Sequence, residues 1–305
     1  MNTPKFSILI TTYNRLEALK YTLNTLNDFL VSDDIEFIIC IDGSTDGTQE
    51  FLRSNYLNIS LICHDESRGL IASRNELLNL TKAKYAISID DDANFLTDNV
   101  LENIEYLFER YPKCGVQSFS VFWDLNVPEN TIKYEDIRLV NGFIGCGHVW
   151  NMEAWKAIPN YPEWFVFYGE EDFAAFQLFK KEWDVFYNPN ILVHHRVSIK
   201  NRSKHKDYYT RLRRSLRAGW YLYFLFYPTK QIPKRFIYTL WVQIKTKIFN
   251  GDLGAIIPII KAIFDVLTNI PKLKTNSNRL SLKQFEEFSK LPSVKIYWKP
   301  KNSNL

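Results

Sequence analysis

Short apolar runs alternate with longer segments of helical period through the first 90 residues. The runs are rich in β-branched residues, and the longer segments repeat an apolar residue every three to four positions, as strands and helices do. We expect strands at residues 6–11, 36–42, 59–63 and 85–90, and helices at residues 15–29, 48–54 and 70–83. This order predicts parallel strands joined by right-handed helical crossovers. Because the runs are apolar throughout, helices should cover both faces of the sheet.

The pattern changes after residue 112 and again near residue 200. The middle part predicts two strands and then two helices, at residues 114–122, 138–143, 152–158 and 173–182. Past residue 200, lysine, arginine and aromatic residues dominate. We therefore expect one domain at residues 1–200 and a helical region at residues 201–305, whose last residues, 295–305, should fray.

Three polar clusters follow the predicted strands, at residues 11–15, 42–48 and 90–92. Ligands of an open parallel sheet bind beyond the carboxyl ends of its strands, so these clusters should meet at one edge. The last cluster is three consecutive aspartates, whose like charges favour a shared cation or full solvation. Taken in isolation, both interpretations are equally good. The first suits a Mg²⁺ or Mn²⁺ ion shared with the phosphates of a diphosphate ligand.

Glycine-rich phosphate loops are missing from the sequence. Neither G-x-G-x-x-G nor G-x-x-x-x-G-K-[ST] occurs, which argues against a dinucleotide-binding dehydrogenase and against a P-loop ATPase. The four cysteines, with no C-x-x-C pair among them, are Cys40, Cys63, Cys114 and Cys146. The first residues also lack the pattern of a secretion signal, so we expect a reduced, cytoplasmic protein.

Charge is divided unevenly along the chain. The formal net charge is +4, but residues 1–195 hold 15 Lys/Arg against 29 Asp/Glu, and residues 196–305 hold 23 against 5. The two parts therefore carry −14 and +18. This division predicts an acidic, cation-using body and a basic region that meets something anionic.

Four motifs occur in an order and spacing that resemble a known enzyme family. They are Ser7–Arg15 (SILITTYNR), Asp42–Thr48 (DGSTDGT), Arg68–Asn75 (RGLIASRN) and Ser88–Asp92 (SIDDD). The sequence resembles the family 2 inverting glycosyltransferases, and the similarity continues to His195. It implies an α/β fold: a Rossmann-like GT-A nucleotide-sugar domain with a mixed, mainly parallel central sheet, plus a helical, basic and aromatic C-terminal region. That region is loosely similar to the rhamnosyltransferase-like branch.

The resemblance implies a donor site and a metal site at these motifs. Residues implied to bind the donor nucleotide are Thr11, Tyr13, Arg15, Asp42, Arg74, Asp90 and Asp91. Asp92 closes the family's D-x-D motif and would be the favoured ligand of Mn²⁺ or Mg²⁺, with Asp90 and His194 as further ligands. A purely structural role is an equally good interpretation of His194. The cation would stabilise the charge on a departing nucleoside diphosphate.

An inverting transfer also needs a general base that deprotonates the acceptor hydroxyl. The resemblance implies that this base comes from the acidic triplet Glu170–Asp172. Alignment on Pro189 makes Glu171 the base, whereas reading the triplet as Glu-Asp selects Asp172; we favour Asp172 and keep Glu171 open. Residues implied to contact the donor sugar or the acceptor are Gly147, His148, Trp150 and Glu170. A position in the core is the alternative for Trp150.

The basic region joins cations to aromatic side chains. Residues 200–217 hold eight Lys/Arg, the aromatic-rich segment 218–227 follows them, and residues 234–241 repeat the pattern. This composition predicts a helix that lies in the interface of an anionic membrane. Packing of the aromatic rings on the first domain and binding of single-stranded nucleic acid are the alternatives. The uncharged apolar stretch 218–227 is ten residues long, too short to span a bilayer, which takes about 20.

Together with the resemblance, these patterns predict a cytoplasmic, membrane-peripheral inverting glycosyltransferase of bacterial surface polysaccharide synthesis. Its donor would be a UDP-sugar or dTDP-rhamnose, and its acceptor a hydroxyl of a glycan or of a polyprenyl-linked sugar. No nucleic acid partner is expected. A catalytically silent assembly factor that binds a nucleotide-sugar or a polysaccharide is the alternative.

Overall fold

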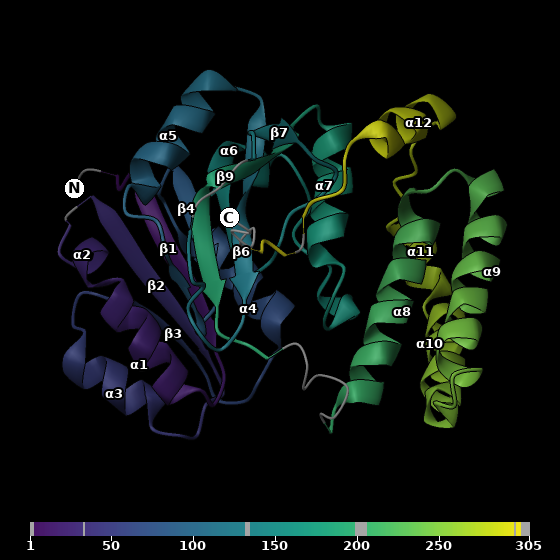
Figure 1. The fold of residues 1–305 in the computed structure, drawn as a ribbon, viewed down its shortest axis with the longest axis horizontal. Coiled ribbons are helices and arrows are strands. Elements are labelled where there is room, and N and C mark those ends of the chain that lie inside the picture. Colours follow the sequence, from purple (N-terminus) through teal and green to yellow (C-terminus); the bar gives the residue numbers. More distant parts are fainter. Residues whose placement is uncertain (1–2, 33, 132–134, 199–205, 296, 300–305) are drawn as a thin grey trace.

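The structure, a computed structural model, is built on a central sheet of nine strands (Figure 1). It describes residues 3–32, 34–131, 135–198, 206–295 and 297–299. The strands are β1 (Phe6–Thr12), β2 (Ile35–Asp42), β3 (Ser60–His64), β4 (Tyr85–Ile89), β5 (Ala93–Phe95), β6 (Cys114–Trp123), β7 (Arg138–Leu139), β8 (Gly147–Asn151) and β9 (Asp184–His195). Their spatial order is β3-β2-β1-β4-β8-β6-β9-β5, and β7 pairs with β9.

The sheet has a parallel half and a mixed half. β1 lies between β2 and β4 and is parallel to both, and β3 is parallel to β2. β8 runs antiparallel between β4 and β6, whereas β6 and β9 are parallel. The predicted mixed, mainly parallel sheet is therefore confirmed. Its parallel half is the part in which apolar runs and helical segments alternate along the sequence.

Helices cover both faces of the sheet, as the unbroken apolar strands predict. They are α1 (Leu16–Thr25), α2 (Asn27–Leu30), α3 (Thr48–Asn55), α4 (Leu70–Leu80), α5 (Val100–Arg110), α6 (Met152–Lys156), the 3-10 helix η1 (Glu163–Phe165) and α7 (Glu170–Lys180). Alternate residues of β1 face two separate cores. Ile8 packs with residues of α1, α3 and α5, and Leu9 with residues of α4, α6 and α7.

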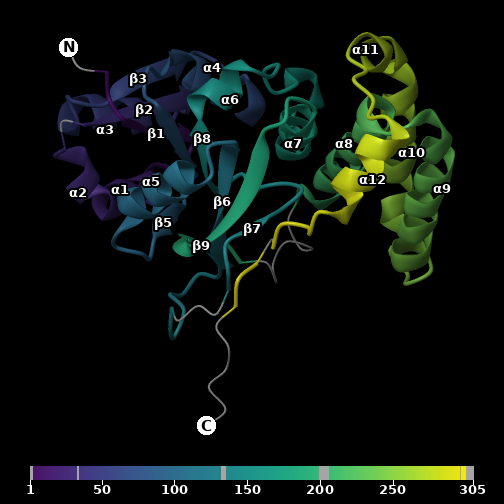
Figure 2. The ribbon, with the colours of Figure 1, turned by 90° about the horizontal axis from the view of Figure 1, so that it is seen from above.

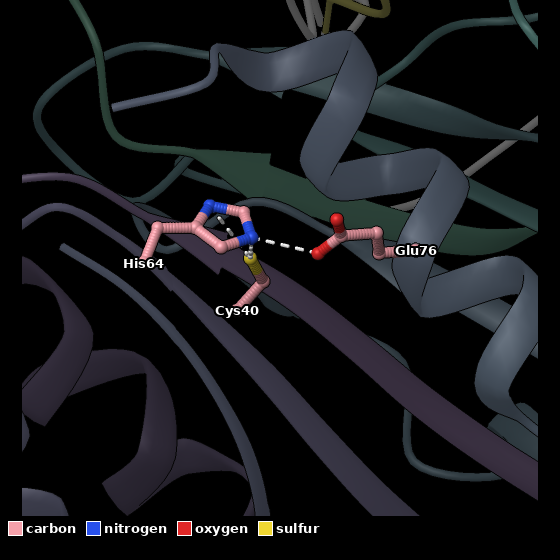
Figure 3. A group of neighbouring side chains, drawn as sticks. All are labelled: Cys40, His64 and Glu76. Atoms are coloured by element: carbon pink, nitrogen blue, oxygen red, sulfur yellow. Dashed lines mark hydrogen bonds and ion pairs between the residues drawn. The ribbon is translucent and has the colours of Figure 1, made fainter. Parts of the chain in front are cut away.

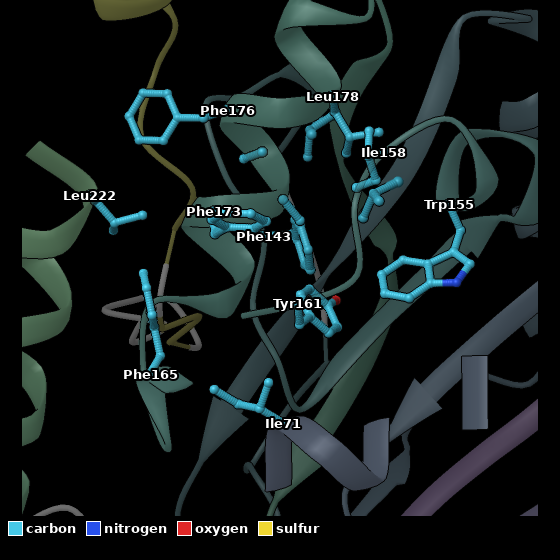
Figure 4. Close-up of a cluster of buried hydrophobic side chains, with 14 of the residues drawn as sticks. Ile71, Phe143, Trp155, Ile158, Tyr161, Phe165, Phe173, Phe176, Leu178 and Leu222 are labelled. Atoms are coloured by element: carbon cyan, nitrogen blue, oxygen red, sulfur yellow. The ribbon is translucent and has the colours of Figure 1, made fainter. Parts of the chain in front are cut away.

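After the sheet, a group of helices packs beside α7 (Figure 2). They are α8 (Tyr208–Phe226), η3 (Thr229–Gln231), α9 (Ile232–Gln243), the π-helix η4 (Ile244–Ile248), η5 (Leu253–Ala255), α10 (Ile256–Thr268), α11 (Ile270–Thr275) and α12 (Leu282–Lys290). Phe226 of α8 stacks on Phe176 of α7 with ring centroids 4.8 Å apart. Figure 4 shows the same buried cluster continuing from Phe173 to Leu222. Among the described residues, no helix combines the length and the apolar character needed to cross a membrane.

Two predictions about this region are wrong. Trp220 and Tyr221 are each 1% exposed, so α8 turns these rings into the protein core and not toward a membrane interface. The predicted fraying of residues 295–305 is wrong for Trp298, which is 3% exposed and whose backbone N–H donates to the carbonyl of Val121 at 2.7 Å; residues 296 and 300–305 lie outside the described residues. The predicted boundary near residue 200, together with Lys200, Arg202 and Lys204, lies outside the described residues.

Candidate active site at the carboxyl ends of the strands

A cavity of about 700 Å³ lies at the carboxyl ends of the strands. Asp90 follows β4, Arg15 follows β1 and His195 ends β9, so two of the three predicted polar clusters meet there. Its polar and glycine lining comprises Arg15, Arg74, Asp90, Asp92, Gly145, Cys146, Tyr168, Glu170, Glu171, His195, Arg196, Ser198 and Arg211. The volume falls within the ~300–1,000 Å³ of pockets that bind small molecules.

The three consecutive aspartates point in different directions. Oδ1 of Asp92 lies 3.1 Å from Nε2 of His195, and Oδ2 of Asp90 lies 4.0 Å from the same nitrogen. Asp91 instead accepts a hydrogen bond of 2.8 Å from Oγ1 of Thr12, is 3% exposed and does not line the cavity. Burial raises the pKa of Asp91 to about 7. The structure thus contradicts the predicted nucleotide contact of Asp91, which ties β1 to the loop after β4.

Asp92 and His195 form a buried ion pair. Burial opposes the charge on Asp92, but the hydrogen bond and charge of His195 and the guanidinium of Arg15 outweigh it and lower the pKa of Asp92 to about 2. Burial also opposes the charge on His195, yet the carboxylates of Asp92 and Asp90 hold the pKa of His195 well above its ordinary value. The pair therefore carries both charges at neutral pH.

Asp90, Asp92 and His195 present two carboxylates and an imidazole nitrogen to the cavity. Ligand atoms of Asp90, Cys146 and His195 all lie within 4.8 Å of one another. Burial raises the pKa of the Cys146 thiol, which leaves that sulfur protonated and a poor ligand. Carboxylate oxygens with one imidazole nitrogen suit Mn²⁺ or Mg²⁺. The residues present therefore fit such an ion, which on binding would displace the proton of the His195 ring.

His194, predicted as a metal ligand, faces away from the aspartates. Its Nε2 lies 2.9 Å from the carbonyl oxygen of Asp124, and its ring centroid lies 5.7 Å from that of Phe122. Successive residues of a strand point to opposite faces, so β9 brings one histidine of the pair to the cavity, and that residue is His195. The structure contradicts the predicted role of His194 and gives the position to its neighbour.

Arg74 of α4 joins the aspartates to the acidic start of α7. Its Nη1 donates to Oε1 of Glu170 and to Oε1 of Glu171, each at 3.1 Å. Its Nη2 donates to Oδ1 of Asp90 at 3.1 Å and to the carbonyl of Gly145 at 3.0 Å. A Cβ on Gly145 would collide with the Glu171 carboxylate and come within 2.9 Å of Nη1, so this close approach needs glycine. Arg74 is 5% exposed and organises the acids of the cavity.

The three acids at the start of α7 separate around the helix axis, because successive helical residues lie about 100° apart. Glu170 and Glu171 line the cavity. Asp172 does not; it is exposed, and its Oδ1 lies 3.5 Å from where a Cβ on Gly142 would be. Burial and the charge of Glu171 raise the pKa of Glu170 to about 8, despite Arg74. Glu171, which the sequence leaves open as the base, therefore lies in the cavity, whereas Asp172, the first choice from the sequence, does not line it.

The loop before α7 has a strained backbone. Val166 and Tyr168 have φ of 70° and 71°, a region that non-glycine residues, and β-branched ones above all, rarely adopt. Nη2 of Arg217, on α8, donates to the carbonyl of Phe165 at 2.6 Å. Tyr168 lines the cavity, and Arg211 reaches it from α8. Strain of this kind clusters at functional sites, and here α8 helps to hold it.

Three residues predicted to contact the donor sugar or the acceptor lie inside the sheet. Trp150 is 0% exposed, and neither it nor Gly147 lines the cavity. His148 is 1% exposed, and its Nδ1 lies 2.9 Å from the carbonyl oxygen of Ile144. Burial lowers the pKa of His148 to about 3. β8 is paired on both sides and every one of its residues is buried, which contradicts these contacts; Gly145, just before it, reaches the cavity instead.

Thr11, Tyr13 and Asp42, predicted to bind the base, lie at the same sheet edge but outside the cavity. Tyr13 is 52% exposed and Asp42 is 5% exposed. The oxygens of Asp42 accept four hydrogen bonds of 2.7–2.9 Å, from Nδ1 of His64, Oγ of Ser67 and the backbone N–H groups of Arg68 and Gly69. In this structure Asp42 therefore holds the loop that leads into α4.

His64 lies between Asp42 and Glu76, and Figure 3 shows its ring beside Cys40 and Glu76. Its Nδ1 is 2.8 Å from Oδ1 of Asp42 and its Nε2 is 2.6 Å from Oε2 of Glu76. Sγ of Cys40 is 4.0 Å from both ring nitrogens, so it lies on the lone-pair direction of neither. Burial raises the pKa of Cys40 to about 12. A metal needs a thiolate and a free imidazole nitrogen, so this group does not fit one and is an ion-pair network.

Three cations of the cavity have no role in the prediction: His195, Arg196 and Arg211. His195 enters the cavity, and His194 does not, because of which face of β9 meets the aspartates. The alternation of side chains along a strand does not by itself tell which face that is. Arg211 comes from α8, where nothing in the local sequence separates it from the neighbouring arginines.

Known proteins with similar sequences are glycosyltransferases. The family model described as "Glycosyl transferase family 2" matches residues 7–177. The chain is 26% identical over 155 residues to the "Putative teichuronic acid biosynthesis glycosyltransferase TuaG" of Bacillus subtilis (strain 168), a match that covers 47% of this chain and 60% of TuaG. The chain thus spans less than two thirds of TuaG, and smaller shares of other curated relatives.

Two solved structures share the fold. S. aureus TarS 1–349 in complex with UDP-GlcNAc superposes with a TM-score of 0.57 at 16% identity, over 89% of this chain and 83% of that one. The mannosyltransferase PcManGT from Pyrobaculum calidifontis, in complex with GDP-Man and Mn²⁺, gives a TM-score of 0.54 at 15% identity, over 95% and 79%. At these identities the likeness shows the fold alone, and it confirms the predicted GT-A architecture.

Proposed function

Because the chain belongs to glycosyl transferase family 2, we propose that it is an inverting glycosyltransferase that moves a sugar from a nucleoside-diphosphate donor to an acceptor hydroxyl. The observation that carries this proposal is a single cavity in which Arg74 bonds to two acids, Asp90 and Glu171. Asp90 lies beside His195, and Glu171 belongs to the start of α7. A cation site and a general base beside one cavity are what departure of a diphosphate and attack by a hydroxyl require.

The donor side of the cavity is rich in groups that suit a metal-diphosphate. Asp90, Asp92 and His195 would hold Mn²⁺ or Mg²⁺, which when bound supplies positive charge that stabilises the departing nucleoside diphosphate. The side chain of Arg15 is 46% exposed and pairs with Asp92, and Arg211 also lines the cavity. Guanidinium groups bind phosphate oxygens through two hydrogen bonds at once, so these arginines can orient the diphosphate.

Glu171 is the base in this proposal. Its carboxylate takes the proton of the acceptor hydroxyl while the hydroxyl oxygen bonds to the anomeric carbon. The bond from that carbon to the diphosphate oxygen breaks on the opposite face, which inverts the configuration. Arg74, at 3.1 Å, holds the carboxylate in place. Since the pKa of Glu170 is raised to about 8, that neighbour is neutral at pH 7 and adds no competing charge.

The proposed donor is a UDP-sugar or dTDP-rhamnose, which makes the protein a hexosyl- or deoxyhexosyltransferase. The complex of TarS with UDP-GlcNAc supports a uridine donor, whereas that of PcManGT with GDP-Man shows that the shared fold accepts another base. The proposed acceptor is a hydroxyl of a glycan or of a polyprenyl-linked sugar at the cytoplasmic face of a bacterial membrane. The name of TuaG, a teichuronic acid biosynthesis glycosyltransferase, supports a surface polysaccharide.

The division into a catalytic domain at residues 1–200 and a membrane-associating region at residues 201–305 belongs to the same proposal. The second part is not independent of the first, because Arg211 of α8 lines the cavity and Arg217 bonds to the loop before α7.

A thermal-shift panel tests the donor and the metal together. UDP-, dTDP- and GDP-sugars are added with and without Mn²⁺, and the melting temperature is read, since a ligand that binds the folded state raises it. We expect one class of donor to stabilise the protein in the presence of Mn²⁺. His195→Gln and Asp92→Asn should lose that increase.

The matched control is His194→Gln, on the other face of the same strand, which should keep the donor-dependent increase. Release of the nucleoside diphosphate is followed in parallel. If no donor raises the melting temperature and none is turned over, the proposed function is wrong. Donor binding without turnover on any acceptor would instead identify a catalytically silent nucleotide-sugar-binding protein.

A further inference from the structure

Exposed large apolar side chains are concentrated on the helices after α8. Of the 24 such residues among the described part of the chain, 11 lie between residues 237 and 270. They are Ile237, Tyr238, Trp241, Phe249, Leu253, Ile256, Ile257, Ile260, Phe264, Leu267 and Ile270, and we call them the outer band. In both overall views α9 and α10 lie on the side of α8 that faces away from the sheet (Figures 1 and 2).

α10 shows that the outer band is more than scattered apolar surface. One stripe of this helix, with Ile259, Ala262 and Val266, is buried and packs on α8. The opposite stripe, with Ile260 and Phe264, is 60% and 62% exposed. A helix with apolar side chains on two opposite stripes is normally covered on both, and contiguous apolar surface on a folded protein marks a docking surface.

The charges around the outer band indicate which kind of surface covers it. Residues 228–276 hold eight Lys/Arg and two acids. Both acids are already bonded: Asp265 to Arg213 and Arg217, and Asp252 to the hydroxyls of Tyr208 and Tyr209. A second copy would bring an equally positive surface against the first. Anionic headgroups complement both the lysines and the apolar side chains.

The outer band is fixed relative to the cavity. The turn between η4 and α10 is tied to the first turn of α8, because Asp252 accepts from Oη of Tyr208 at 3.2 Å and from Oη of Tyr209 at 2.8 Å. Nζ of Lys247 lies 2.9 Å from the same Tyr208 oxygen. One turn further along α8, Arg211 lines the cavity. Phe249, at the tip of this turn, is 67% exposed.

We propose that the outer band docks on an anionic phospholipid leaflet, with α9 and α10 lying in the interface and their lysines on the headgroups. The two helices have 12 and 13 residues, so each lies along the surface and cannot cross it. The contact is made by these helices and not by Trp220, Tyr221 and Phe226 of α8, which are buried. Docking itself does not depend on the donor chemistry, whereas its use, holding the cavity beside a lipid-linked acceptor, rests on the proposed function.

Vesicle flotation of the full chain tests the proposal. The probes are vesicles of phosphatidylcholine alone and of phosphatidylcholine with equimolar phosphatidylglycerol. We expect binding to the second kind, weakened by salt. Ile260→Glu with Phe264→Glu should lower the partition coefficient at least ~10-fold, because two apolar side chains leave the interface. Lys245→Gln and Lys261→Gln should each lower it about fivefold, on anionic vesicles only.

The matched control is Leu57→Glu with Leu80→Glu, which changes two exposed leucines of the sheet body, 91% and 51% exposed, and should float like the wild type. All variants should keep the wild-type melting temperature and the wild-type turnover of the donor on a water-soluble acceptor. Loss of turnover with flotation intact counts against the proposed function only.

Three results would overturn the docking proposal. One is a wild-type chain that stays with the soluble fraction on both kinds of vesicle. Another is a glutamate pair that floats as well as the wild type. The third is a wild-type dimer that Ile260→Glu with Phe264→Glu converts to a monomer, which would assign the outer band to contact between copies.

Discussion

The sheet body and the helices after it differ from the usual distribution of side chains, with apolar groups buried and charges exposed, in opposite ways. In the body, apolar residues are covered on both faces, and the unusual feature is buried charge: Arg74 and Asp92 are each 5% exposed or less. In α9 and α10 the lysines are at the surface, and the unusual feature is exposed apolar surface such as Ile260 and Phe264. Buried charge and exposed apolar surface are the departures that carry information about function.

Each region has a surface that suits a particular ligand. The buried acids of the body surround a cavity whose lining suits a cation and a diphosphate, and the exposed apolar side chains of the outer band suit a docking surface. α8 links the two regions, because it packs Phe226 on α7 and also sends Arg211 into the cavity. The net charge of +4 conceals this division.

The strongest prediction separates two adjacent acids of the body. Glu171→Gln removes the proposed base while keeping the shape of the side chain. Turnover should fall about 10²–10⁴-fold, the contribution typical of general-base catalysis. Steady-state rates of nucleoside-diphosphate release measure it. Donor affinity should change little, because the proton is transferred only as the sugar moves.

Asp172→Asn is the matched control, one position along α7 and outside the cavity. Its turnover should stay close to the wild-type value. The reverse pattern, with Asp172→Asn inactive and Glu171→Gln active, would identify Asp172 as the base, as the sequence alone predicts.

The second prediction contrasts buried with solvated cations. Arg74→Met leaves Asp90, Glu170 and Glu171 without their shared partner, and breaking a buried ion pair costs about 3–5 kcal/mol of unfolding free energy. Lys261→Gln, on exposed α10, should change the same quantity by less than about 0.5 kcal/mol. Urea unfolding without divalent cations measures both. A loss of unfolding free energy below about 1 kcal/mol for Arg74→Met would mean that solvent screens these charges and that Arg74 does not form a buried ion pair.

The third prediction makes the same contrast with apolar side chains. Ile87 of β4 is 0% exposed, so Ile87→Ala should cost about 2–4 kcal/mol through lost burial and a cavity. Ile260 is 60% exposed, so Ile260→Ala should stay within about 0.5 kcal/mol of the wild type. Urea unfolding of the vesicle-free protein compares them. Equal losses would show that the outer band is packed in solution, which removes the basis of the docking proposal.

The sheet body was largely predictable because its determinants are local. The run predicted at residues 36–42 is β2 (Ile35–Asp42), and the helix predicted at residues 48–54 is α3 (Thr48–Asn55). α4 ends at Leu80, earlier than its period suggests, because Oγ1 of Thr81 bonds to Oγ of Ser7 on β1. That partner is distant in sequence, and no pattern around Thr81 reveals it.

The incorrect predictions share a cause in long-range packing. Whether His194 or His195 meets the aspartates depends on the pairing of β9 with β5 and β6. The local composition of a helix rich in aromatic residues is the same whether its rings face lipid or protein. For α8, the contact of Phe226 with Phe176 shows that this ring faces protein. Trp150 is likewise placed by the two strands that flank β8.

The smallest predicted effect depends on pH and returns to the buried acids. Burial, Glu171 and Asp172 raise the pKa of Glu170 to about 8 against the pull of Arg74, from an ordinary value of about 4.3. Between these values the folded state holds a proton that the unfolded state has lost, so stability is full below the lower value and falls as pH rises toward 8.

Glu170→Gln is neutral at every pH. Its unfolding free energy relative to the wild type should therefore rise from pH 5 to pH 8, by about 1–2 kcal/mol. Glu286→Gln, exposed on α12, should show no such rise in urea unfolding across that range, and parallel curves for the two variants would mean that Glu170 is ionised in the cavity at neutral pH.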